Sequence, residues 1–364
     1  MNRAPVIETL RVHACRIATD GEECDGTLCW TATELVIVEL GAGDVTGFGY
    51  SYTQAAPAAA LIDDKLADIV RGADAFDLPA LWQRMSAALR NLGRPGLASM
   101  ALAAVDIALW DLKARLLGVP LAQLFGCARA SVPVYGSGGF TNDDDARLAA
   151  QLGGWVRDGI RAVKMKIGRN PDDDPRRVRL ARETVGADVA LMVDANGALD
   201  RVTALALAHE LARFDVCWFE EPVSSDDVDG LRWLAERAPP GMAIAAGEYG
   251  WDARYFHRLL QSGAVGVLQA DATRCGYTGF LQVATLCDSL QVPLSAHCAP
   301  AIHVPVCAAA TRLRHLEYFH DHTRIESRLF DGIPALRDGA LAPDLSRPGH
   351  GLALRREEIA RHGI

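Results

Sequence analysis

From residue 132 onward, short apolar runs of strand length alternate with longer stretches of helical pattern. A helix must return the chain to the same end before each new strand begins, so this alternation implies parallel strands. Eight such units favour a closed (β/α)₈ barrel, an α/β fold, over an open sheet. An open sheet would be expected to carry a Gly-rich phosphate-binding motif after its first strand, and the sequence has none there. The runs are residues 132–135, 162–167, 190–193, 216–219, 243–246, 265–270, 292–296 and 315–319.

The rest of the chain is expected to form a second, smaller unit. Residues 1–128 have a mixed pattern that predicts an α+β capping domain, followed by the barrel at 129–325. The Pro- and Gly-rich tail, 326–364, is expected to leave the barrel and pack back on the cap. The cap elements predicted by turn signals and helical periodicity are a hairpin, 35–40 with 45–50, and helices near 55–71, 77–92 and 97–117.

Composition limits the possible partners and location. Lys and Arg number 37 and Asp and Glu 46, a net charge of −9, which argues against nucleic acid and anionic membranes as partners. The first ten residues lack an apolar signal core, and no apolar run approaches the ~18 residues that span a bilayer. Nine cysteines occur without a C-x-x-C pair. We therefore expect reduced thiols and a cytoplasmic protein.

Ionisable residues recur at the carboxyl ends of the predicted strands, where barrels of this kind carry their chemistry. Asp194, Glu220 and Glu248 end three successive strands and should converge within a few ångströms. Three carboxylates so close repel one another, and a divalent hard cation resolves the conflict. Oxygen ligands select Mg²⁺, or Mn²⁺, over zinc. Taken alone, each residue could equally be a solvated surface carboxylate.

Two pairs of residues on other strands supply the candidate bases. Lys164 and Lys166 alternate within one strand and so point to one face. Next to a bound cation, each ammonium should depress the pKa of the other. His297 ends a later strand, and Asp271 on the neighbouring strand can fix its tautomer. Lys166 and His297 would face a substrate from opposite sides. This arrangement suits inversion of configuration, or proton removal by one base while the other assists a leaving group.

Glu317, on the last strand, has two interpretations. It can form an ion pair with an arginine such as Arg314, or it can donate a hydrogen bond to a substrate carboxylate, which requires a raised pKa. Three further histidines, His303, His320 and His322, are expected to be surface or core residues.

Together these residues resemble the enolase superfamily, and within it the mandelate racemase subgroup. The resemblance covers nearly the whole chain. The motifs that carry it are AAVDIALWDLKARLLGVPLAQLFG in the cap, at 103–126, and VKMKIG, VDANGA, WFEEPV, AAGE, QADATRCG, SAHCAP and HLEYF in the barrel.

By this resemblance, Asp194, Glu220 and Glu248 are the metal ligands, and Lys166 and His297 are the two bases. Asp271 is the partner of His297, Lys164 helps to hold the substrate carboxylate, Glu317 is the electrophilic acid, and Asn196 is a polar contact near the metal.

The resemblance also implies that two cap loops close over the substrate and select it. They are residues 19–30, which carry Asp25, and 49–53, which carry Tyr50, and both residues are candidate substrate contacts. These loops lack a large apolar patch, so they fit a hydroxylated acid better than mandelate. Relatives with a barrel and a cap commonly form homo-oligomers, which we carry over as an expectation.

The resulting prediction is Mg²⁺-dependent removal of the proton alpha to a substrate carboxylate through an enediolate, with dehydration of an aldonic or aldaric acid to a 2-keto-3-deoxy acid as the leading reaction. Racemisation, epimerisation or cycloisomerisation of a 2-hydroxy acid, lactone or amino-acid derivative is the near alternative. A Schiff-base aldolase that uses Lys164 or Lys166 would leave the three carboxylates unexplained. A non-enzymatic binding protein would be expected to lose its bases.

Overall fold

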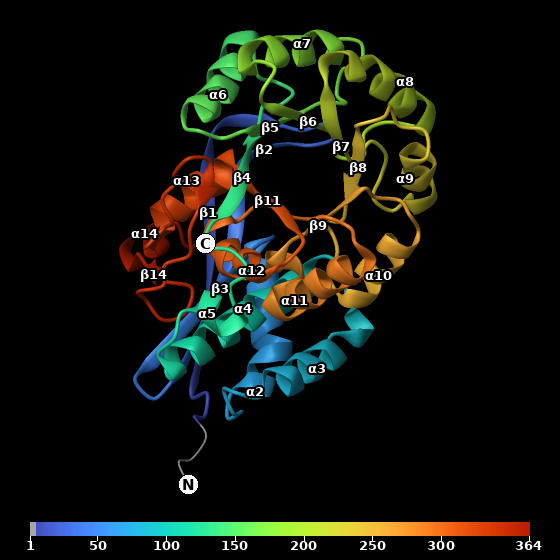
Figure 1. Ribbon diagram of the computed structural model, residues 1–364. Coiled ribbons are helices and arrows are strands. Elements are labelled where there is room, and N and C mark those ends of the chain that lie inside the picture. The colour runs from blue at the N-terminus through green and yellow to red at the C-terminus, as the bar shows by residue number, and fades with distance from the viewer. Residues whose placement is uncertain (1–4) are drawn as a thin grey trace.

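The computed structural model describes residues 5–364 and consists of a barrel and a cap (Figure 1). Within those residues, eight parallel strands, β4 to β11, pair in chain order, and β11 pairs with β4 to close the ring. A helix follows each barrel strand, and Figure 1 shows α6 to α10 around the outside of the ring. The predicted fold class is confirmed, and each predicted run lies in or overlaps one barrel strand.

The barrel strands are β4 (Val132–Gly138), β5 (Ala162–Lys166), β6 (Ala190–Asp194), β7 (Val216–Glu220), β8 (Ala243–Ala246), β9 (Val267–Ala270), β10 (Leu294–Ala296) and β11 (Leu313–Phe319). The helices that follow them in turn are α6 (Asp145–Arg157), α7 (Asp174–Val185), α8 (Arg201–Leu211), α9 (Val228–Ala235), α10 (Ala253–Gln261), α11 (Ala272–Leu290), α12 (Pro300–Ala309) and α13 (His320–Leu329).

Aspartates fix the starts of five of these helices. In each case the side chain accepts a hydrogen bond from a backbone N–H of the first turn, which otherwise lacks a partner inside the helix. One of them, Asp271, also holds a histidine at the barrel mouth. The capping residues are Asp144, Asp200, Asp227, Asp252 and Asp271.

Large side chains fill the barrel interior below its mouth. Tyr135 and Trp218 are completely buried with ring centroids 6.4 Å apart, and Met192 and Val267 belong to the same cluster. The Lys164 ammonium lies 5.4 Å from the centroid of the Tyr135 ring, so the charged layer rests directly on this apolar plug. The barrel is therefore a packed core with chemistry at one end.

The cap consists of an antiparallel sheet and helices packed on it. The predicted hairpin lies in β2 and β3, and a third strand, β1, pairs along β2 although the sequence did not predict it. The cap elements are β1 (Thr9–Cys24), β2 (Cys29–Ala42), β3 (Val45–Tyr52), α1 (Ala55–Leu61), a π-helical turn (Ile62–Leu66), α2 (Ala67–Val70), α3 (Leu78–Ala88), a 3₁₀ turn (Arg90–Leu92), α4 (Leu97–Leu117) and α5 (Leu121–Phe125).

Helix α4 is buried on nearly all sides and connects the cap to the barrel through the contacts of its side chains. The carboxylate of Asp106, in the middle of α4, accepts hydrogen bonds from the backbone N–H and the hydroxyl of Thr278 on α11, at 2.9 and 2.6 Å. Trp110 Nε1 donates to the same hydroxyl at 2.9 Å. Asp106 interrupts an apolar run, and its polar contacts fix the orientation of the cap over the barrel.

The C-terminal segment contacts both units. Strand β13 pairs antiparallel with β4, while Arg356 on α14 binds Glu39 on β2 at 2.7 Å. Helix α13 continues past residue 325, where the barrel was expected to end. The remaining elements are β12 (Phe330–Asp331), β13 (Ala340–Leu341), β14 (Ala353–Leu354) and α14 (Arg356–Arg361).

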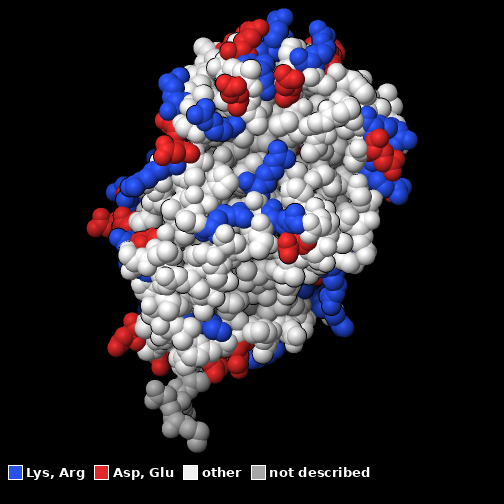
Figure 2. Space-filling view, in the orientation of Figure 1, with Lys and Arg blue, Asp and Glu red and all other residues white. Residues whose placement is uncertain are grey.

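The outer helices of the barrel carry many exposed charged side chains. On the face in Figure 2, acidic and basic side chains lie side by side along the upper rim. Ion pairs between neighbouring elements include Arg176 with Asp145 at 2.7 Å and Arg201 with Asp227 at 2.5 Å. In the described part of the chain, no helix is both long and apolar enough to cross a membrane.

Glycines of β3 allow α4 to approach the sheet closely. A Cβ at Gly49 would lie 2.5 Å from both the carbonyl oxygen of Ala104 and the amide nitrogen of Ala108. We expect Gly49→Ala to lower the free energy of unfolding by about 1–3 kcal/mol, because the helix must move away. Thermal melting measures the change.

The control is Gly154→Ala on α6, where the nearest atom to the new Cβ is the Arg157 guanidinium at 3.8 Å. We expect that variant to gain about 0.5–1 kcal/mol, as alanine is the better helix former. Equal melting temperatures for the two variants would contradict the packing argument.

Candidate active site

The barrel register brings the predicted side chains to one end. Lys166, Asp194 and Glu220 end β5, β6 and β7, and they are direct neighbours in the strand pairing. All three are buried. Glu248, Asp271 and His297 follow β8, β9 and β10 at the same end.

The two lysines pair with carboxylates inside the barrel mouth. Lys166 Nζ lies 2.5 Å from Asp194 Oδ2. Lys164 Nζ lies 2.6 Å from Glu220 Oε1, 3.0 Å from Glu317 Oε1 and 3.5 Å from Asp194 Oδ2. Lys164 thus joins strands β6, β7 and β11 through one ammonium group.

Lys164 lowers the pKa of Lys166, as expected, but the carboxylates around the two lysines outweigh this effect. Burial lowers the pKa of Lys164, but Glu220 and Glu317 outweigh it and raise that pKa well above its usual value. Burial likewise lowers the pKa of Lys166, and Asp194 reverses the effect. The sequence predicted the positions of the two lysines. Their pKa values also depend on the surrounding carboxylates, whose distances only the structure gives.

His297 is held by the partner that the sequence suggested. Its Nδ1 lies 2.9 Å from Asp271 Oδ2, so Nε2 points toward Glu248 and Glu317, at 3.5 and 3.7 Å from their Oε2 atoms. Burial lowers the pKa of His297, but Glu248, Glu317 and Asp271 together raise it to about 9. The surroundings therefore favour the imidazolium.

Glu317 differs from its expected state. Its ion-pair partner is Lys164 rather than Arg314, whose guanidinium lies 5.7 Å from the Trp218 ring. Burial raises the pKa of Glu317, but Lys164 and His297 outweigh it and hold that pKa well below its ordinary value. The carboxylate here accepts hydrogen bonds, and the donor role would require these cations to be redistributed.

Several buried oxygens at the mouth lack a donor and fit a hard cation. Among residues 5–364, Glu248 Oε2, Glu221 Oε1 and Asn196 Oδ1 have no hydrogen-bond partner. Burial and Asp194 raise the pKa of Glu220 to about 8, and burial and Glu248 raise that of Glu221 well above its usual range. Mg²⁺ and Mn²⁺ prefer oxygen ligands, and an ion here would replace the lysines that now compensate Asp194 and Glu220. In the described structure, Asp194, Glu220 and Glu248 do not offer three oxygens that all lie within 4.8 Å of one another. Glu221 was not among the predicted site residues, although it follows Glu220 directly.

Backbone strain is concentrated at this end of the barrel. Asn196, Glu221, Cys298 and Ala299 have positive φ angles of 47°, 36°, 53° and 40°. All four lie just after a barrel strand. Such conformations are costly for residues with a Cβ and cluster at functional sites. The surrounding contacts hold these conformations. For example, the backbone N–H of Asn196 donates to Asp194 Oδ1 at 2.8 Å.

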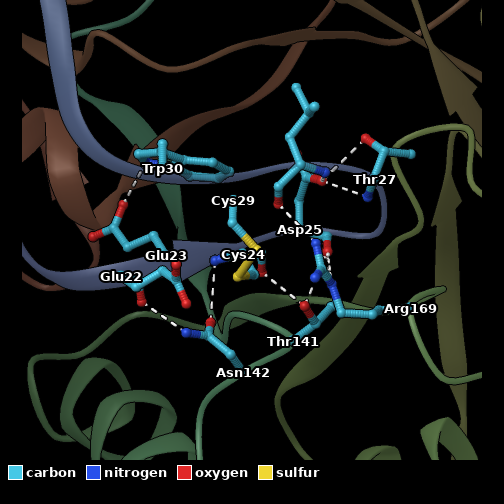
Figure 3. Close-up of a disulfide and its surroundings, with 11 residues drawn as sticks. Glu22, Glu23, Cys24, Asp25, Thr27, Cys29, Trp30, Thr141, Asn142 and Arg169 are labelled. Carbon is cyan, nitrogen blue, oxygen red and sulfur yellow. Dashed lines mark hydrogen bonds between the residues drawn. A yellow bond between two sulfur atoms is a disulfide. The ribbon is translucent and has the colours of Figure 1, made fainter.

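The first cap loop, between β1 and β2, docks on the barrel mouth (Figure 3). Arg169 donates to the carbonyl oxygens of Asp25 and Leu28 at 3.1 and 3.0 Å. The Thr141 hydroxyl donates to the Asp25 carbonyl at 2.9 Å, and the Asn142 amide donates to the Glu22 carbonyl at 2.8 Å. The loop is thus held by the segments that follow β4 and β5.

A disulfide joins the two ends of this loop and corrects the expectation that all cysteines are reduced. Cys24 and Cys29 face each other across the β1–β2 pairing and are bonded. Their spacing of five residues matches no redox or zinc motif, so only the strand register reveals the pair. The seven other cysteines are free.

The two candidate substrate contacts from the cap loops are placed differently from the expectation. Asp25 Oδ1 accepts hydrogen bonds from the amides of Thr27 and Leu28, both at 2.6 Å, and so shapes the turn. Tyr50 is fully buried and its hydroxyl donates to Glu326 at 2.6 Å. Tyr50 is therefore a core residue in this structure and does not reach the barrel mouth.

Other cap and barrel residues line the entrance. One cavity of about 660 Å³ is lined by Tyr52, His322 and Arg274 among others, and a second of about 510 Å³ is lined by Asn196, Glu221 and Arg274. Arg274 therefore borders both. Arg274 was missed because nothing in the local sequence separates an entrance arginine from a surface arginine.

The three extra histidines have separate positions. His303 is buried, with Nε2 accepting from the Ala272 amide at 2.7 Å. His322 stacks on Tyr52 with ring centroids 3.5 Å apart. His320 lies 3.3 Å from Asp20 near the surface. The core or surface interpretation suits His303 and His320, whereas His322 lines the entrance.

Known proteins resemble the chain over its whole length. A 3,6-anhydro-alpha-L-galactonate cycloisomerase from Streptomyces coelicolor is 35% identical over 99% of this chain and 100% of its own. The solved structure of a mandelate racemase/muconate lactonizing enzyme-like protein from Rubrobacter xylanophilus matches with a TM-score of 0.96 and 52% identity, covering 99% of this chain and 100% of that one.

A third match is the L-talarate/galactarate dehydratase of Salmonella typhimurium, solved with Mg and L-lyxarohydroxamate. It is 30% identical with a TM-score of 0.92, and the match covers 99% of this chain and 92% of the dehydratase.

The fold and the charged barrel mouth define a barrel enzyme with a capping domain, and the family models agree. Residues 27–126 match the mandelate racemase / muconate lactonizing enzyme N-terminal domain, and residues 146–359 match the enolase C-terminal domain-like family. The chain belongs to the enolase superfamily, in its mandelate racemase subgroup, as its motifs indicated.

The tip of the docked loop rests on the strand ends. A Cβ at Gly26 would lie 2.3 Å from the carbonyl oxygen of Ala195 and 2.8 Å from that of Ile167. We expect Gly26→Ala to lift the loop, because backbone atoms cannot yield as a flexible side chain can. Hydrogen–deuterium exchange of peptides covering 25–31 should become faster.

Gly21→Ala provides the control within the same segment, since its Cβ would meet only the Arg147 guanidinium at 3.4 Å. Unchanged exchange in Gly26→Ala, or the same acceleration in both variants, would show that the close approach does not hold the loop.

Proposed function

We propose that this enzyme removes the proton alpha to the carboxylate of a hydroxylated acid in a Mg²⁺-dependent reaction, most simply the dehydration of an aldonic or aldaric acid to a 2-keto-3-deoxy acid. The observation that carries the proposal is that Lys166 and His297, the two proposed bases, contact carboxylates at the same end of the barrel, Lys166 at Asp194 and His297 at Glu248. The cycloisomerase and the dehydratase described above, both acting on sugar acids by name, support this substrate class.

Asp194, Glu220 and Glu248 are the proposed ligands of the metal, with Asn196 nearby. Bound there, Mg²⁺ would offset the negative charge that builds up on the substrate carboxylate as the alpha proton leaves. A carboxylate alpha proton is too weakly acidic for a side chain to remove without such compensation.

Lys166 is the proposed base. Its ammonium now pairs with Asp194, so it can accept a proton only after this pair is broken and its own proton is lost. Lys164 contacts Glu220 and Glu317 at the strand ends, where its positive charge can hold the substrate carboxylate. The barrel mouth thereby orients the acid before any proton moves.

His297 is the proposed acid for the leaving hydroxyl. Asp271 accepts from Nδ1, which leaves Nε2 as the nitrogen that exchanges a proton with the substrate. The carboxylates of Asp271, Glu248 and Glu317 stabilise the imidazolium, the form that donates. A base on one side and a proton donor on the other suit elimination of water.

The entrance supports a polar, anionic substrate. Arg274 borders both cavities, and Tyr52 has a buried hydroxyl without a hydrogen-bond partner in the described chain. These groups can bind the hydroxyls or a second carboxylate of a sugar acid. The cytoplasmic location, the homo-oligomeric state and the cap-loop contact through Asp25 stay predictions.

The main test is ¹H NMR of the enzyme with Mg²⁺ in D₂O against aldonic acids, aldaric acids and their lactones. Signals of a 2-keto-3-deoxy acid are the expected result. Loss of the alpha-proton signal without a keto acid would favour racemisation, epimerisation or cycloisomerisation instead. If none of the substrates shows either change, the proposal is overturned.

Separate variants test the two bases. We expect Lys166→Ala and His297→Asn each to lower kcat by about 10²–10⁴-fold, the range for loss of one general acid–base group. Arg201→Ala, on the outer face of α8, is the control and should keep the wild-type rate. A His297→Asn variant with the wild-type rate would remove His297 from the mechanism.

Metal removal tests the carboxylate cluster. We expect a chelator to abolish activity and Mg²⁺ to restore it, with Mn²⁺ as a substitute. Asp194→Asn should weaken Mg²⁺ binding measured by calorimetry, because it removes one anionic ligand. Full activity in the chelated enzyme would contradict the assignment of Asp194, Glu220 and Glu248.

A further inference from the structure

A second group of metal-binding side chains lies beside the carboxylate cluster. His297 Nε2, Cys298 Sγ and Glu317 Oε2 lie within 4.8 Å of one another. Cys298 follows His297 in the chain, and Glu317 comes from the next strand, β11. We propose that these three residues form a site for a thiophilic divalent cation such as Zn²⁺, distinct from the all-oxygen site assigned to Mg²⁺.

The distances fit tetrahedral coordination. Zn²⁺ bonds to nitrogen, oxygen and sulfur at about 2.0–2.3 Å, which places the ligand atoms of a tetrahedron about 3.4–3.6 Å apart. Here Sγ lies 3.2 Å from Nε2 and 3.4 Å from Oε2, and Nε2 lies 3.7 Å from Oε2. Small side-chain movements are enough to place a zinc ion between them.

The groups behind these ligands are those that zinc sites use. A histidine ligand of zinc usually donates its other ring nitrogen to a carboxylate, which fixes the ring and raises its basicity. Asp271 does this for His297 at 2.9 Å, while its other oxygen accepts from the Thr273 amide and hydroxyl, both at 2.7 Å. The histidine is therefore already oriented toward the site.

Glu317 can serve both its present partner and a cation. Its Oε1 contacts Lys164 at 3.0 Å, which leaves Oε2 toward Cys298 and His297. Glu248 is assigned to Mg²⁺, so the fourth position is left for water. Three protein ligands with one further position is an arrangement that zinc commonly adopts.

Cys298 is the residue that makes this site selective. Thiolate and imidazole ligands favour zinc over Mg²⁺, whereas carboxylates alone do not. On binding, the Cys298 S–H bond and the N–H bond at Nε2 of the His297 imidazolium break, Zn–S and Zn–N bonds form, and both protons leave to the solvent. No electron transfer is involved.

Zinc at this site would inhibit the enzyme, because Nε2 of His297 could no longer exchange a proton with a substrate. This consequence rests on the proposed function, whereas the binding itself does not. The two are therefore tested separately, first by binding and then by activity.

The binding test uses Co²⁺ as a spectroscopic probe, added to the full-length protein in saturating Mg²⁺. We expect a thiolate-to-cobalt charge-transfer band in the near ultraviolet together with the visible bands of tetrahedral cobalt. Both should be lost in Cys298→Ser and Cys298→Ala and kept in Cys127→Ser, which removes an exposed thiol elsewhere. A six-coordinate spectrum without the thiolate band, identical in all variants, would overturn the proposal.

Zinc affinity is then measured by competition with a chromophoric chelator, again in saturating Mg²⁺. We expect one Zn²⁺ per chain. In Cys298→Ser the affinity for zinc should be weaker by about 100-fold, the upper end of the range for loss of a residue that supports a metal ligand. Melting curves check that each variant is folded. Displacement of the zinc by Mg²⁺, or equal affinity in wild type and Cys298→Ser, would place the zinc at the carboxylate cluster and contradict the site.

The activity test follows on whichever substrate the NMR panel identifies. Zn²⁺ should inhibit the wild type and Cys127→Ser at concentrations that leave Cys298→Ser active. If zinc binds without inhibiting the enzyme, the zinc site stands but the proposed role of His297 in proton exchange with the substrate is contradicted. The zinc site and the proposed function can therefore fail independently.

Discussion

The buried ion pairs of Lys164 and Lys166 link the carboxyl ends of the barrel strands. Two ammonium groups and the carboxylates of Asp194, Glu220 and Glu317 lie at the barrel mouth with little access to water. Buried charges are tolerated only when they compensate one another, since removal of one partner leaves an unpaired charge. The closed ring of strands supplies this compensation from four different strands.

The cap completes this environment. It reaches the barrel through Asp106 on α4, which binds Thr278, and through the loop at Gly26, which rests on the strand ends. Both contacts join parts of the chain far apart in sequence. A water-poor mouth strengthens every charge interaction inside it, so the cap contributes to the chemistry without supplying a reacting group.

His297 links the two chemical proposals. The same imidazole that faces the carboxylate cluster also faces the Cys298 thiol, and Asp271 holds it for both. The positive φ angles of Cys298 and Ala299 turn the chain sharply after β10 and bring the thiol to the mouth. Cys298 is therefore placed to contribute to the zinc site proposed above.

The sequence by itself determined the architecture and most of the proposed site. Eight apolar runs of strand length allow little besides a closed barrel, and the polar residues near the ends of six of these runs must reach the same end because parallel strands share a direction. This argument found Lys166, Asp194, Glu220, Glu248, Asp271 and His297 without any contact being known. Helix periodicity and glycine-containing turns were also sufficient for most of the cap.

Only the tertiary structure decided the remaining features. The charge state of Lys166 and Glu317, the Cys24–Cys29 bond, the burial of Tyr50 and the entrance position of Arg274 all depend on neighbours distant in sequence. A pKa depends on every charge within a few ångströms and on burial, and a disulfide depends on strand register. Local sequence fixes which residues end a strand, whereas three-dimensional packing fixes what each of them contacts.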